Sequence, residues 1–462
     1  MAGSDDRVHV LLVSYPAQGH INPLLQFGKR LAAHRPGGVR CTLAVARSAL
    51  AGSSTLQPAG TVRVAAFSDG CDRGGYDEVG DVRAYLARLE SAGSRTLDEL
   101  LRAEAAHGRA VRAVVYDAFL AWAPPVARRH GAWCAAFFTQ PCAVNVAYAH
   151  AWRGDLRLPM AEVPAELPGL PAGLEPADFS TFLTQPTPPG SSSYLDLLLQ
   201  QCQGLEVADH VLINTFHDLQ TEEAEYMAAR WGAKTVGPTL PSSYLDNRIP
   251  DDSSYNFDIR TPMTAECKAW LDNRSTHSVV YVAFGSLATL GLDQMDEMAK
   301  GLYNSGKAFL WVVRESKTSK IPENFVNKLK GKGLVVTWCP QLEVLAHDAI
   351  GCFVTHCGWN STMEGLSMGV PMVAMPQWSD QPMNAKYIED VWQVGVRARR
   401  DAKGVVTNEE IERCVREVME GELSKEYKKN AMSWRERAKR AMSQGGSSDR
   451  NILEFLSKLG SN

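Results

Sequence analysis

Short apolar stretches of strand-forming residues alternate with amphipathic, helix-like stretches twice along the chain. In the first half, HVLLVSYP at residues 9–16 is followed by a helical pattern from Pro23 and then by VRCTLAVA. The apolar stretches lie at residues 9–16, 39–46, 112–117, 133–139, 278–284, 308–313, 333–338, 349–355, 370–375 and 394–397. Continuous apolar strands separated by amphipathic helices are typical of parallel sheets covered on both faces. The pattern therefore predicts an α/β fold.

A polar segment broken by proline separates two such regions. Residues 241–262 read PSSYLDNRIPDDSSYNFDIRTP, a composition typical of a linker between domains. We therefore expect an N-terminal Rossmann-like domain over residues 1–240 and a C-terminal one over 263–442, with a final helix at about 443–462 packing back on the first domain. Two doubly wound domains that face each other would hold a ligand beyond the carboxyl ends of their strands.

The charge balance and the hydropathy exclude several classes of protein. The chain has 48 basic and 52 acidic side chains, and its net charge of −4 argues against a nucleic-acid or anionic-membrane surface. No run approaches about 18 apolar residues, the length that a membrane span requires. The first residues lack the basic segment and the long apolar core of a secretory signal. We expect a cytoplasmic protein, by default a monomer.

The chain also lacks the usual signatures of metal and dinucleotide sites. None of its ten cysteines forms a C-x-x-C pair, and the spacing of Cys352, His356 and Cys357 does not match a zinc site. We expect reduced, buried cysteines and no metal. There is no G-x-G-x-x-G fingerprint, which disfavours a dinucleotide-dependent oxidoreductase. There is also no D-x-D pair of the kind that holds a metal in many sugar transferases.

The segment from Trp338 to Gln381 concentrates the chemistry-bearing residues. Trp338 follows an apolar strand, so it lies at the carboxyl edge of a sheet, where an indole offers a flat face to a nucleobase. His356 stands in a glycine turn that leads from a strand into a helix near Asn360, and such a turn exposes backbone N–H groups that bind phosphate. The alternatives are an ordinary tryptophan of the core or rim, and simple N-capping of the helix by Asn360 and Ser361.

Three acidic or amide side chains in this segment suit a sugar nucleotide. Glu364 lies on the same helix face as Ser361, and its carboxylate could accept hydrogen bonds from a ribose diol. Asp380 and Gln381 follow a strand in a loop at the same sheet edge and could hold the hydroxyls of a sugar. The alternatives are a first-turn Glu that complements the helix dipole and a solvated loop.

The first half supplies a candidate base. His20 lies in a turn after the first strand, before a helix for which we expect Asn22 as the cap and Pro23 as the first residue. Asp117 ends another strand, so both residues belong to carboxyl strand ends of one sheet. A neutral imidazole can take a hydroxyl proton if a carboxylate holds its other nitrogen. The alternative is two unrelated loop residues.

The order of these residues resembles the signature box of the plant family 1 UDP-glycosyltransferases. The resemblance extends over essentially the whole chain, from YPAQGHINPLLQ at residues 15–26 to GGSSDRNILEFL at 445–456, and is strongest to the branch that acts on plant acids, thiols, terpenoids and steroids. It implies a GT-B fold of two facing Rossmann-like domains. It also implies UDP-glucose as a co-substrate, with no cofactor and no metal.

Carried over position by position, the resemblance also implies the roles of the site residues. Trp338 would stack on uracil and Glu364 would bind ribose, with Gln341 near the nucleoside. The expected diphosphate contacts are His356, Asn360, Ser361 and Ser286. The expected contacts of the donor sugar are Trp359, Asp380, Gln381 and Thr139. His20 and Asp117 would form the catalytic pair.

The expected reaction is an inverting transfer of glucose from UDP-glucose to a small apolar acceptor such as a plant secondary metabolite, a hormone or a xenobiotic, giving a β-glucoside. The acceptor group is left open among hydroxyl, carboxyl and thiol. Candidate walls of the acceptor pocket are Phe119, Trp122, Phe138, Tyr148 and the loop 159–193. Core packing explains the aromatic residues equally well, and disorder explains the loop equally well. The alternative is a non-catalytic protein that binds UDP-sugar or another small molecule.

Overall fold

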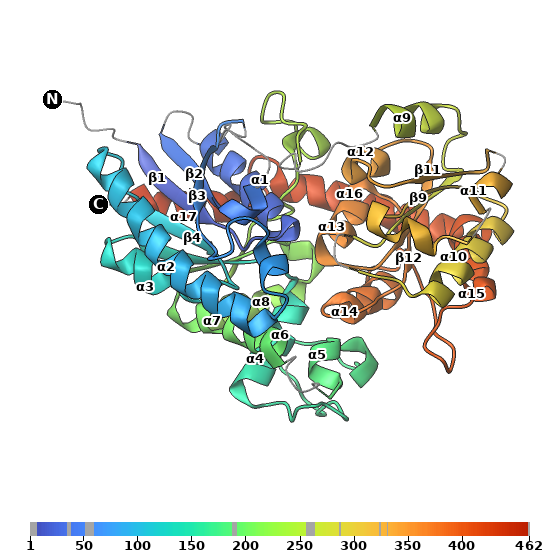
Figure 1. Cartoon of the computed structure of the whole chain (residues 1–462), viewed down its shortest axis with the longest axis horizontal. Coiled ribbons are helices and arrows are strands. Elements are labelled where there is room, and N and C mark those ends of the chain that lie inside the picture. Colours follow the sequence, from blue (N-terminus) through green and yellow to red (C-terminus); the bar gives the residue numbers. More distant parts are fainter. Residues whose placement is uncertain are drawn as a thin grey trace. The chain divides into compact units, whose positions relative to one another are not determined.

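The computed structural model describes residues 7–34, 38–50, 60–186, 192–255, 264–285, 288–322, 325–329 and 331–460. The chain divides into two compact units (Figure 1). Unit 1 comprises Met1–Ile259 and Arg440–Asn462, and unit 2 comprises Arg260–Lys439. Each unit contains one of the two α/β regions that the sequence predicts.

Unit 1 is built on a sheet of seven strands, all paired in parallel, in the order β3-β2-β1-β4-β5-β6-β7. The strands are β1 (Val8–Val13), β2 (Val39–Ala46), β3 (Arg63–Phe67), β4 (Ala113–Asp117), β5 (Trp133–Phe138), β6 (His210–Ile213) and β7 (Lys234–Thr235). Nearly every residue of the central strands is buried, as expected for a sheet covered on both faces. The sequence pattern missed β3, β6 and β7.

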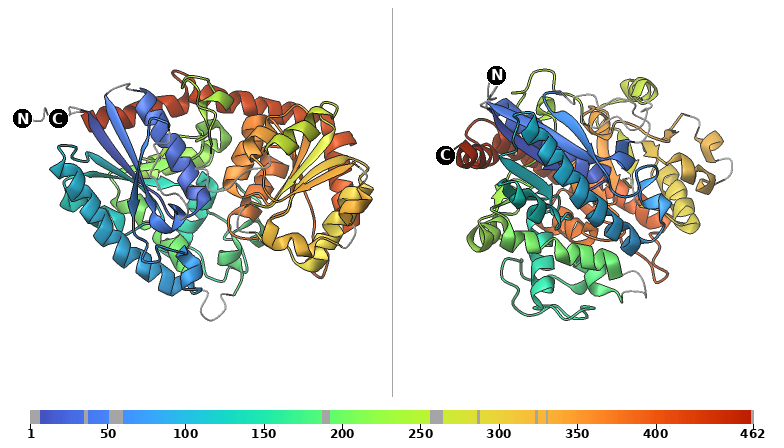
Figure 2. Two further views of the ribbon diagram at one scale, coloured as in Figure 1. Left: turned by 45° about the horizontal axis from the view of Figure 1, so that its top comes forward. Right: turned by 60° about the vertical axis from the view of Figure 1, so that its left-hand side comes forward.

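The helices of unit 1 cover both faces of this sheet. They are α1 (Gln18–His34), α2 (Val82–Ala106), α3 (Ala123–Arg129), α4 (Cys142–Arg153), α5 (Thr181–Thr184), α6 (Ser192–Gln200), α7 (Gln203–Val207), α8 (Thr221–Trp231) and α17 (Ser447–Gly460). Helix α1 packs against α17, and α2 packs against α3 (Figure 2). The connection from β1 through α1 to β2 runs in the direction opposite to that from β4 through α3 to β5, so right-handed crossovers place the two helices on opposite faces.

Unit 2 contains a second wholly parallel sheet, of six strands in the order β10-β9-β8-β11-β12-β13. The strands are β8 (Val279–Ala283), β9 (Ala308–Val312), β10 (Gly333–Val336), β11 (Ile350–Thr355), β12 (Met372–Ala374) and β13 (Gly395–Arg397). The helices are α9 (Thr264–Asp272), α10 (Leu292–Asn304), α11 (Phe325–Lys328), α12 (Gln341–Leu345), α13 (Trp359–Met368), α14 (Gln381–Lys386), α15 (Asn408–Glu420) and α16 (Ser424–Met442), which ends in unit 1. The predicted pair of Rossmann-like domains is confirmed.

The core of unit 2 explains the glycine at position 301. Gly301 lies on α10 where this helix meets α15, and a Cβ atom at this position would come within 2.6 Å of the Ile411 side chain. The glycine therefore permits close packing of two helices on one face of the sheet. Around this contact, a continuous apolar cluster includes Met298, Trp311 and Val415.

Helix α1 begins earlier than the sequence suggests, and the expected cap at Asn22 is wrong. The helix starts at Gln18, because Ala17 O accepts the N–H groups of His20 and Ile21 at 2.9 and 3.0 Å. Asn22 and Pro23 lie inside the helix, where proline removes one backbone hydrogen bond. His20 therefore stands in the first helical turn, on a rigid element.

Residues 241–255, the first part of the expected linker, are fastened to α1 within unit 1. Arg30 forms a bidentate pair with Asp246, with N–O distances of 2.8 and 2.6 Å. Lys29 Nζ lies 2.8 Å from Asp252 Oδ1, and all four side chains are buried. The remainder of the expected linker, 256–262, lies outside the described residues.

Helix α17, in the region where we expected a final helix, lies in unit 1 and contacts α1 and β7. Its Asp449 accepts hydrogen bonds from His34 at 2.7 Å and from Arg248 at 2.6 Å.

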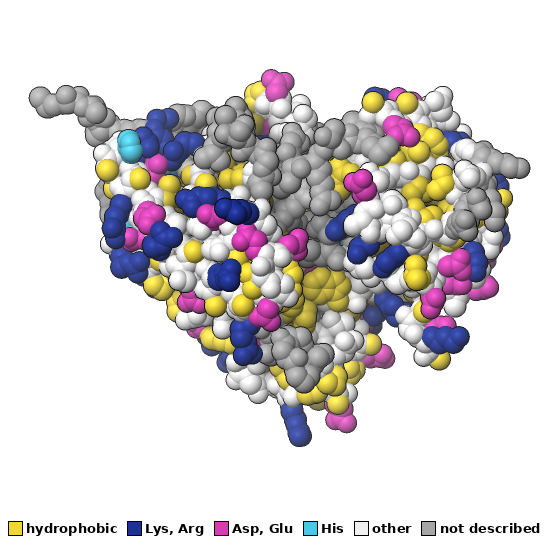
Figure 3. Space-filling model, viewed as in Figure 1, with side chains coloured by type: hydrophobic (Ala, Val, Ile, Leu, Met, Phe, Trp, Pro, Cys, Tyr) yellow, Lys and Arg dark blue, Asp and Glu magenta, His cyan; other side chains and the backbone are white. Residues whose placement is uncertain are grey.

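No helix in the described part of the chain is long and apolar enough to cross a membrane. All ten cysteines are buried and none forms a disulfide. Basic and acidic side chains are interspersed on the face shown in Figure 3.

A buried glutamate with two arginine partners in unit 1 gives a prediction for stability against pH. Glu104 lies 2.5 Å from Arg63 and 2.8 Å from Arg109. Burial alone would raise the pKa of Glu104, but the two arginine hydrogen bonds outweigh it and lower the pKa to about 2. We expect Glu104→Gln to lower the free energy of unfolding at pH 7 by about 3 kcal/mol, measured by chemical denaturation.

The depressed pKa means that this stabilisation is present above about pH 4.5 and disappears as pH falls toward 2. The difference between the wild type and Glu104→Gln should therefore shrink between pH 5 and 3. Glu99→Gln, which removes an exposed pair with Arg95, is the control and should change little at any pH. A difference that is independent of pH would contradict the assignment.

Candidate functional site

The carboxyl edge of the unit 1 sheet brings His20 and Asp117 together. His20 follows β1 in the first turn of α1, and Asp117 is the last residue of β4, the strand beside β1. His20 Nδ1 lies 2.7 Å from Asp117 Oδ2, although the residues are 97 positions apart. The Asp117 side chain is only 1% exposed, whereas His20 retains 17%.

The Asp117 carboxylate is held in one orientation. Its Oδ1 accepts the backbone N–H of Phe119 at 3.0 Å, which leaves Oδ2 to accept the Nδ1–H of His20. A carboxylate in this position selects the tautomer in which His20 Nε2 carries the lone pair, and it stabilises the imidazolium that forms on proton uptake. The arrangement suits a general base whose reactive atom is Nε2.

Aromatic side chains surround the His20 imidazole. Its ring centroid lies 5.2 Å from that of Tyr15 and 4.8 Å from that of Phe119, and Thr139 Oγ1 lies 3.4 Å from Nδ1. Burial raises the pKa of the Tyr15 phenol, which therefore stays neutral beside the histidine. Tyr15 was not among the residues expected from the sequence, although its position two residues after β1 was a usable signal.

The four expected walls of the acceptor pocket fall into two groups. Phe119 and Trp122 are half-buried, and Phe119 lies against His20. Phe138 and Tyr148 have no exposed surface, and the Tyr148 hydroxyl donates to Ser180 Oγ at 2.8 Å. The latter two are core residues of unit 1 in this structure. The expected loop 159–193 is described only in part, since 187–191 lie outside the described residues.

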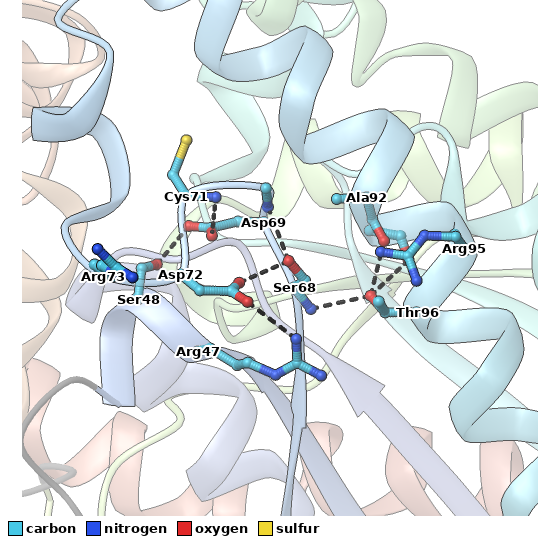
Figure 4. A network of polar contacts seen from close by, with 12 residues as sticks. Arg47, Ser48, Ser68, Asp69, Cys71, Asp72, Arg73, Ala92, Arg95 and Thr96 are labelled. Atoms are coloured by element: carbon cyan, nitrogen blue, oxygen red, sulfur yellow. Dashed lines mark hydrogen bonds and ion pairs between the residues drawn. The ribbon is translucent and has the colours of Figure 1, made fainter.

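A polar network closes the loop after β3, at the same sheet edge (Figure 4). The buried Asp69 carboxylate accepts hydrogen bonds from Ser48 Oγ, from the Tyr85 hydroxyl at 3.1 Å and from the Cys71 N–H at 3.0 Å. Ser68 Oγ donates to Asp72 at 2.6 Å. Both carboxylates are therefore occupied in shaping the loop, which gives unit 1 a second ordered segment at this edge.

In unit 2, the turn after β11 holds His356 between two glycines. A Cβ atom on Gly285 or Gly358 would come within 2.6 or 2.4 Å of His356 Nε2, so only glycine leaves room for the ring. Burial, with a smaller effect of the Arg314 charge, lowers the pKa of His356 to about 4, and the ring is therefore neutral at pH 7. Its buried Nδ1 has no hydrogen-bond partner among the described residues.

Helix α13 starts directly after this turn. Its N-cap residue is Gly358, which supplies no side-chain cap, and the helix begins at Trp359. Asn360 and Ser361 therefore lie inside the first turn, and N-capping does not explain them. The first turn of a helix carries backbone N–H groups and a positive dipole end that suit an anion, and the Asp380 carboxylate already accepts one of these N–H groups, from Trp359.

The nucleoside side of the expected site is already connected by hydrogen bonds. Gln341, at the start of α12, donates through Nε2 to Ser361 Oγ at 2.9 Å and to Glu364 Oε2 at 2.8 Å. Its Oε1 accepts the Tyr281 hydroxyl at 3.2 Å. Trp338 is half-buried just beyond β10. The structure therefore connects the start of α12 to the first turns of α13, a contact that the sequence alone did not show.

Two of the residues expected near the sugar, Asp380 and Gln381, lie at the start of α14. Gln381 Oε1 accepts the N–H groups of Gln377 and Trp378 at 2.8 and 3.1 Å, which leaves its amide nitrogen as the donor for a ligand. Burial raises the pKa of Asp380 to about 6. The Trp359 side chain is buried against Trp392, with ring centroids 6.2 Å apart. The expected phosphate contact Ser286 lies outside the described residues.

Known proteins resemble this chain over nearly its whole length. A family model described as UDP-glucoronosyl and UDP-glucosyl transferase matches residues 215–438. UDP-glucosyltransferase UGT13248 of Hordeum vulgare subsp. vulgare is 50% identical over 98% of this chain and 94% of its own length. Crocetin glucosyltransferase 2 of Crocus sativus is 47% identical over 98% and 96%. The crystal structure of Os79 from O. sativa in complex with UDP matches with a TM-score of 0.91 and 46% identity, covering 97% of this chain and 100% of that chain.

The contact between His356 and Gly358 gives a prediction for anion binding. We expect Gly358→Ala to weaken the affinity for UDP about tenfold or more, measured by calorimetry, because the new methyl group displaces the imidazole. The backbone of Gly358 is not the obstacle, since its φ of −59° suits alanine.

Gly365→Ala on the same helix is the matched control. Its Cβ would meet the flexible end of Met372 at 3.0 Å and the edge of the Phe353 ring at 3.4 Å but no residue of the expected site, so UDP affinity should stay unchanged. A folded Gly358→Ala variant with wild-type affinity for UDP would show that His356 does not contact the diphosphate.

Proposed function

Since the chain belongs to the plant family 1 UDP-glycosyltransferases, we propose that it transfers glucose from UDP-glucose to a small apolar acceptor, with inversion, to give a β-glucoside. Membership of this family, together with the two parallel sheets, confirms the predicted GT-B fold. The observation that carries the proposed chemistry is the 2.7 Å contact between His20 Nδ1 and Asp117 Oδ2.

The proposed reaction is a single displacement. His20 Nε2 removes the proton from the acceptor, and Asp117 stabilises the imidazolium that results. The acceptor atom forms a bond to the anomeric carbon as the bond from that carbon to the diphosphate oxygen breaks, so UDP leaves with the electron pair. Attack opposite to the leaving group converts the α-linked donor into a β-linked product.

Unit 2 contains groups that suit the leaving diphosphate. The start of α13 offers N–H groups and a positive dipole end, and the neutral His356 can donate one hydrogen bond without a change of charge. We propose that these fixed dipoles stabilise the developing charge without a divalent cation. Gln341 and Glu364 would hold the nucleoside, and Asp380 with Gln381 would hold the sugar hydroxyls.

The surroundings of His20 favour an apolar, flat acceptor bound mainly by unit 1. Tyr15 and Phe119 line the approach to the imidazole, and both present aromatic surface. One relative is named crocetin glucosyltransferase 2, and crocetin is compatible with this class of acceptor. The nucleophile would be a hydroxyl, carboxyl or thiol, since one base beside an apolar wall can serve all three.

The experiment that tests this function incubates the protein with UDP-glucose and a panel of phenols, terpenoids and carboxylic acids. The readouts are UDP release and the mass gain of a hexosyl unit on the acceptor. We expect both, also in the presence of EDTA. Binding of UDP-glucose without transfer to any acceptor would favour a non-catalytic sugar-nucleotide binding protein.

The pair of His20 and Asp117 gives a prediction for catalysis. We expect His20→Ala to lower kcat by about 10²- to 10⁴-fold, because the acceptor keeps its proton, while UDP affinity stays within about twofold. Steady-state kinetics and calorimetry measure the two effects. His130→Ala, which removes another histidine–aspartate pair of unit 1, is the control. Equal losses of turnover and donor affinity in His20→Ala would contradict a role as base.

The Gln341–Glu364 contact gives a prediction for ribose binding. We expect Glu364→Ala to weaken UDP binding by about tenfold or more, because a buried carboxylate that accepts from the ribose diol is lost. Glu343→Ala on the exposed face of α12 is the control and should bind UDP as the wild type does. Unchanged UDP affinity in Glu364→Ala would remove the ribose assignment.

A further inference from the structure

Asn384 joins two parts of the donor site that the sequence keeps 23 or more residues apart. It lies on α14, and its side chain is buried, with 1% exposure. The amide nitrogen Nδ2 donates to Cys357 O at 2.8 Å, in the turn before α13, and to Asp380 Oδ2 at 2.7 Å. One nitrogen therefore connects the turn 356–358, which we call the phosphate turn because we expect it to bind the diphosphate, to the carboxylate expected to hold the sugar.

The contact with Cys357 O controls the direction of a backbone donor. Cys357 has a φ of +65°, a conformation that costs a residue with a side chain about 1 kcal/mol or more. In a trans peptide, the C=O of Cys357 and the N–H of Gly358 point in opposite directions. Anchoring the carbonyl on Asn384 thus aims the Gly358 N–H away from Asn384, at the start of α13.

The contact with Asp380 controls a charge. Burial raises the pKa of this carboxyl to about 6, and hydrogen bonds from Asn384, Ser379 and the Trp359 backbone oppose the rise. Loss of the Asn384 donor would raise the pKa of Asp380 further, so that Asp380 would take up a proton at a higher pH than in the wild type. The neighbouring Cys357 thiol stays neutral because burial raises its pKa, on which Arg397 has a smaller, opposing effect.

We infer that Asn384 is a positioning residue that holds the phosphate turn and the Asp380 carboxylate in one arrangement, so that the diphosphate and the donor sugar are bound together. The inference rests on the proposed function and adds a residue beyond the segment 338–381. An amide suits the position because one nitrogen carries two hydrogens and can satisfy two acceptors. Leucine, of similar volume, would leave both acceptors buried without this donor.

The test compares Asn384→Leu with the wild type by calorimetry, using UDP-glucose, UDP and uridine. We expect the affinities for UDP-glucose and UDP to fall by about tenfold or more, because two buried acceptors lose their donor. Uridine affinity should stay within about twofold, since Trp338 and Gln341 keep their contacts. Equal losses for all three ligands would overturn the inference, because they would indicate general damage to unit 2.

The pH dependence of UDP-glucose binding provides a second readout, which a merely structural role would not move. UDP-glucose has no group that titrates near neutral pH, so the protein determines the profile. In the wild type we expect affinity to weaken as pH falls through about 6, where Asp380 takes up a proton. In Asn384→Leu the weakening should begin at higher pH. A uniform loss at every pH would overturn the inference.

Two further variants keep the test decisive. Asn384→Ser retains one donor and should lose less affinity for UDP-glucose than Asn384→Leu, which also covers the case in which the leucine variant fails to fold. Asn430→Leu is the matched control, since Asn430 Nδ2 donates to Gln393 O at 2.9 Å from an exposed position. Absence of glucosyl transfer by the wild type would refute the proposed function alone, because the binding measurements do not require turnover.

Discussion

The chemistry of both units depends on strands that run parallel, because only parallel neighbours bring their carboxyl ends to one edge of a sheet. The pairing of β1 with β4 sets Val13 opposite Tyr116, so Asp117 at the end of β4 meets His20, which follows β1 in the first turn of α1. The pairing of β8 with β11 likewise brings Gly285 against the His356 ring. An antiparallel neighbour would have carried its next residues to the opposite edge, and neither contact would exist.

Most polar groups at these edges are already occupied by protein partners. Asp117 is held by Phe119 and His20, and Gln341 is held between Tyr281 and Glu364. Such preorganisation means that little rearrangement is needed when charge develops in a reaction. His356 differs, since its buried Nδ1 has no partner among the described residues. A buried polar atom of this kind is costly unless a partner completes it, which supports the proposed contact of His356 with the diphosphate.

The differences between expectation and structure follow from the limits of a local pattern. The strands β6 and β7 have only four and two residues, too few to show a period, and they form because the sheet supplies their partners. The expected cap at Asn22 failed because the turn closes on Ala17, before the proline. Phe138, at the end of β5, and Tyr148, inside α4, show that an aromatic residue near the expected site can belong to the core instead of a pocket.

The order of amino acids was sufficient for two α/β units and for the spacing that places Ser361 and Glu364 on one face of a helix, since both follow from neighbours a few positions apart. The tertiary structure alone decided that His20 rests on Asp117, that Gln341 bridges Ser361 and Glu364, and that Asn384 joins Cys357 to Asp380. The physical reason is that these contacts depend on which strands lie side by side and on how their loops pack. Local hydrophobic periodicity carries no information about either.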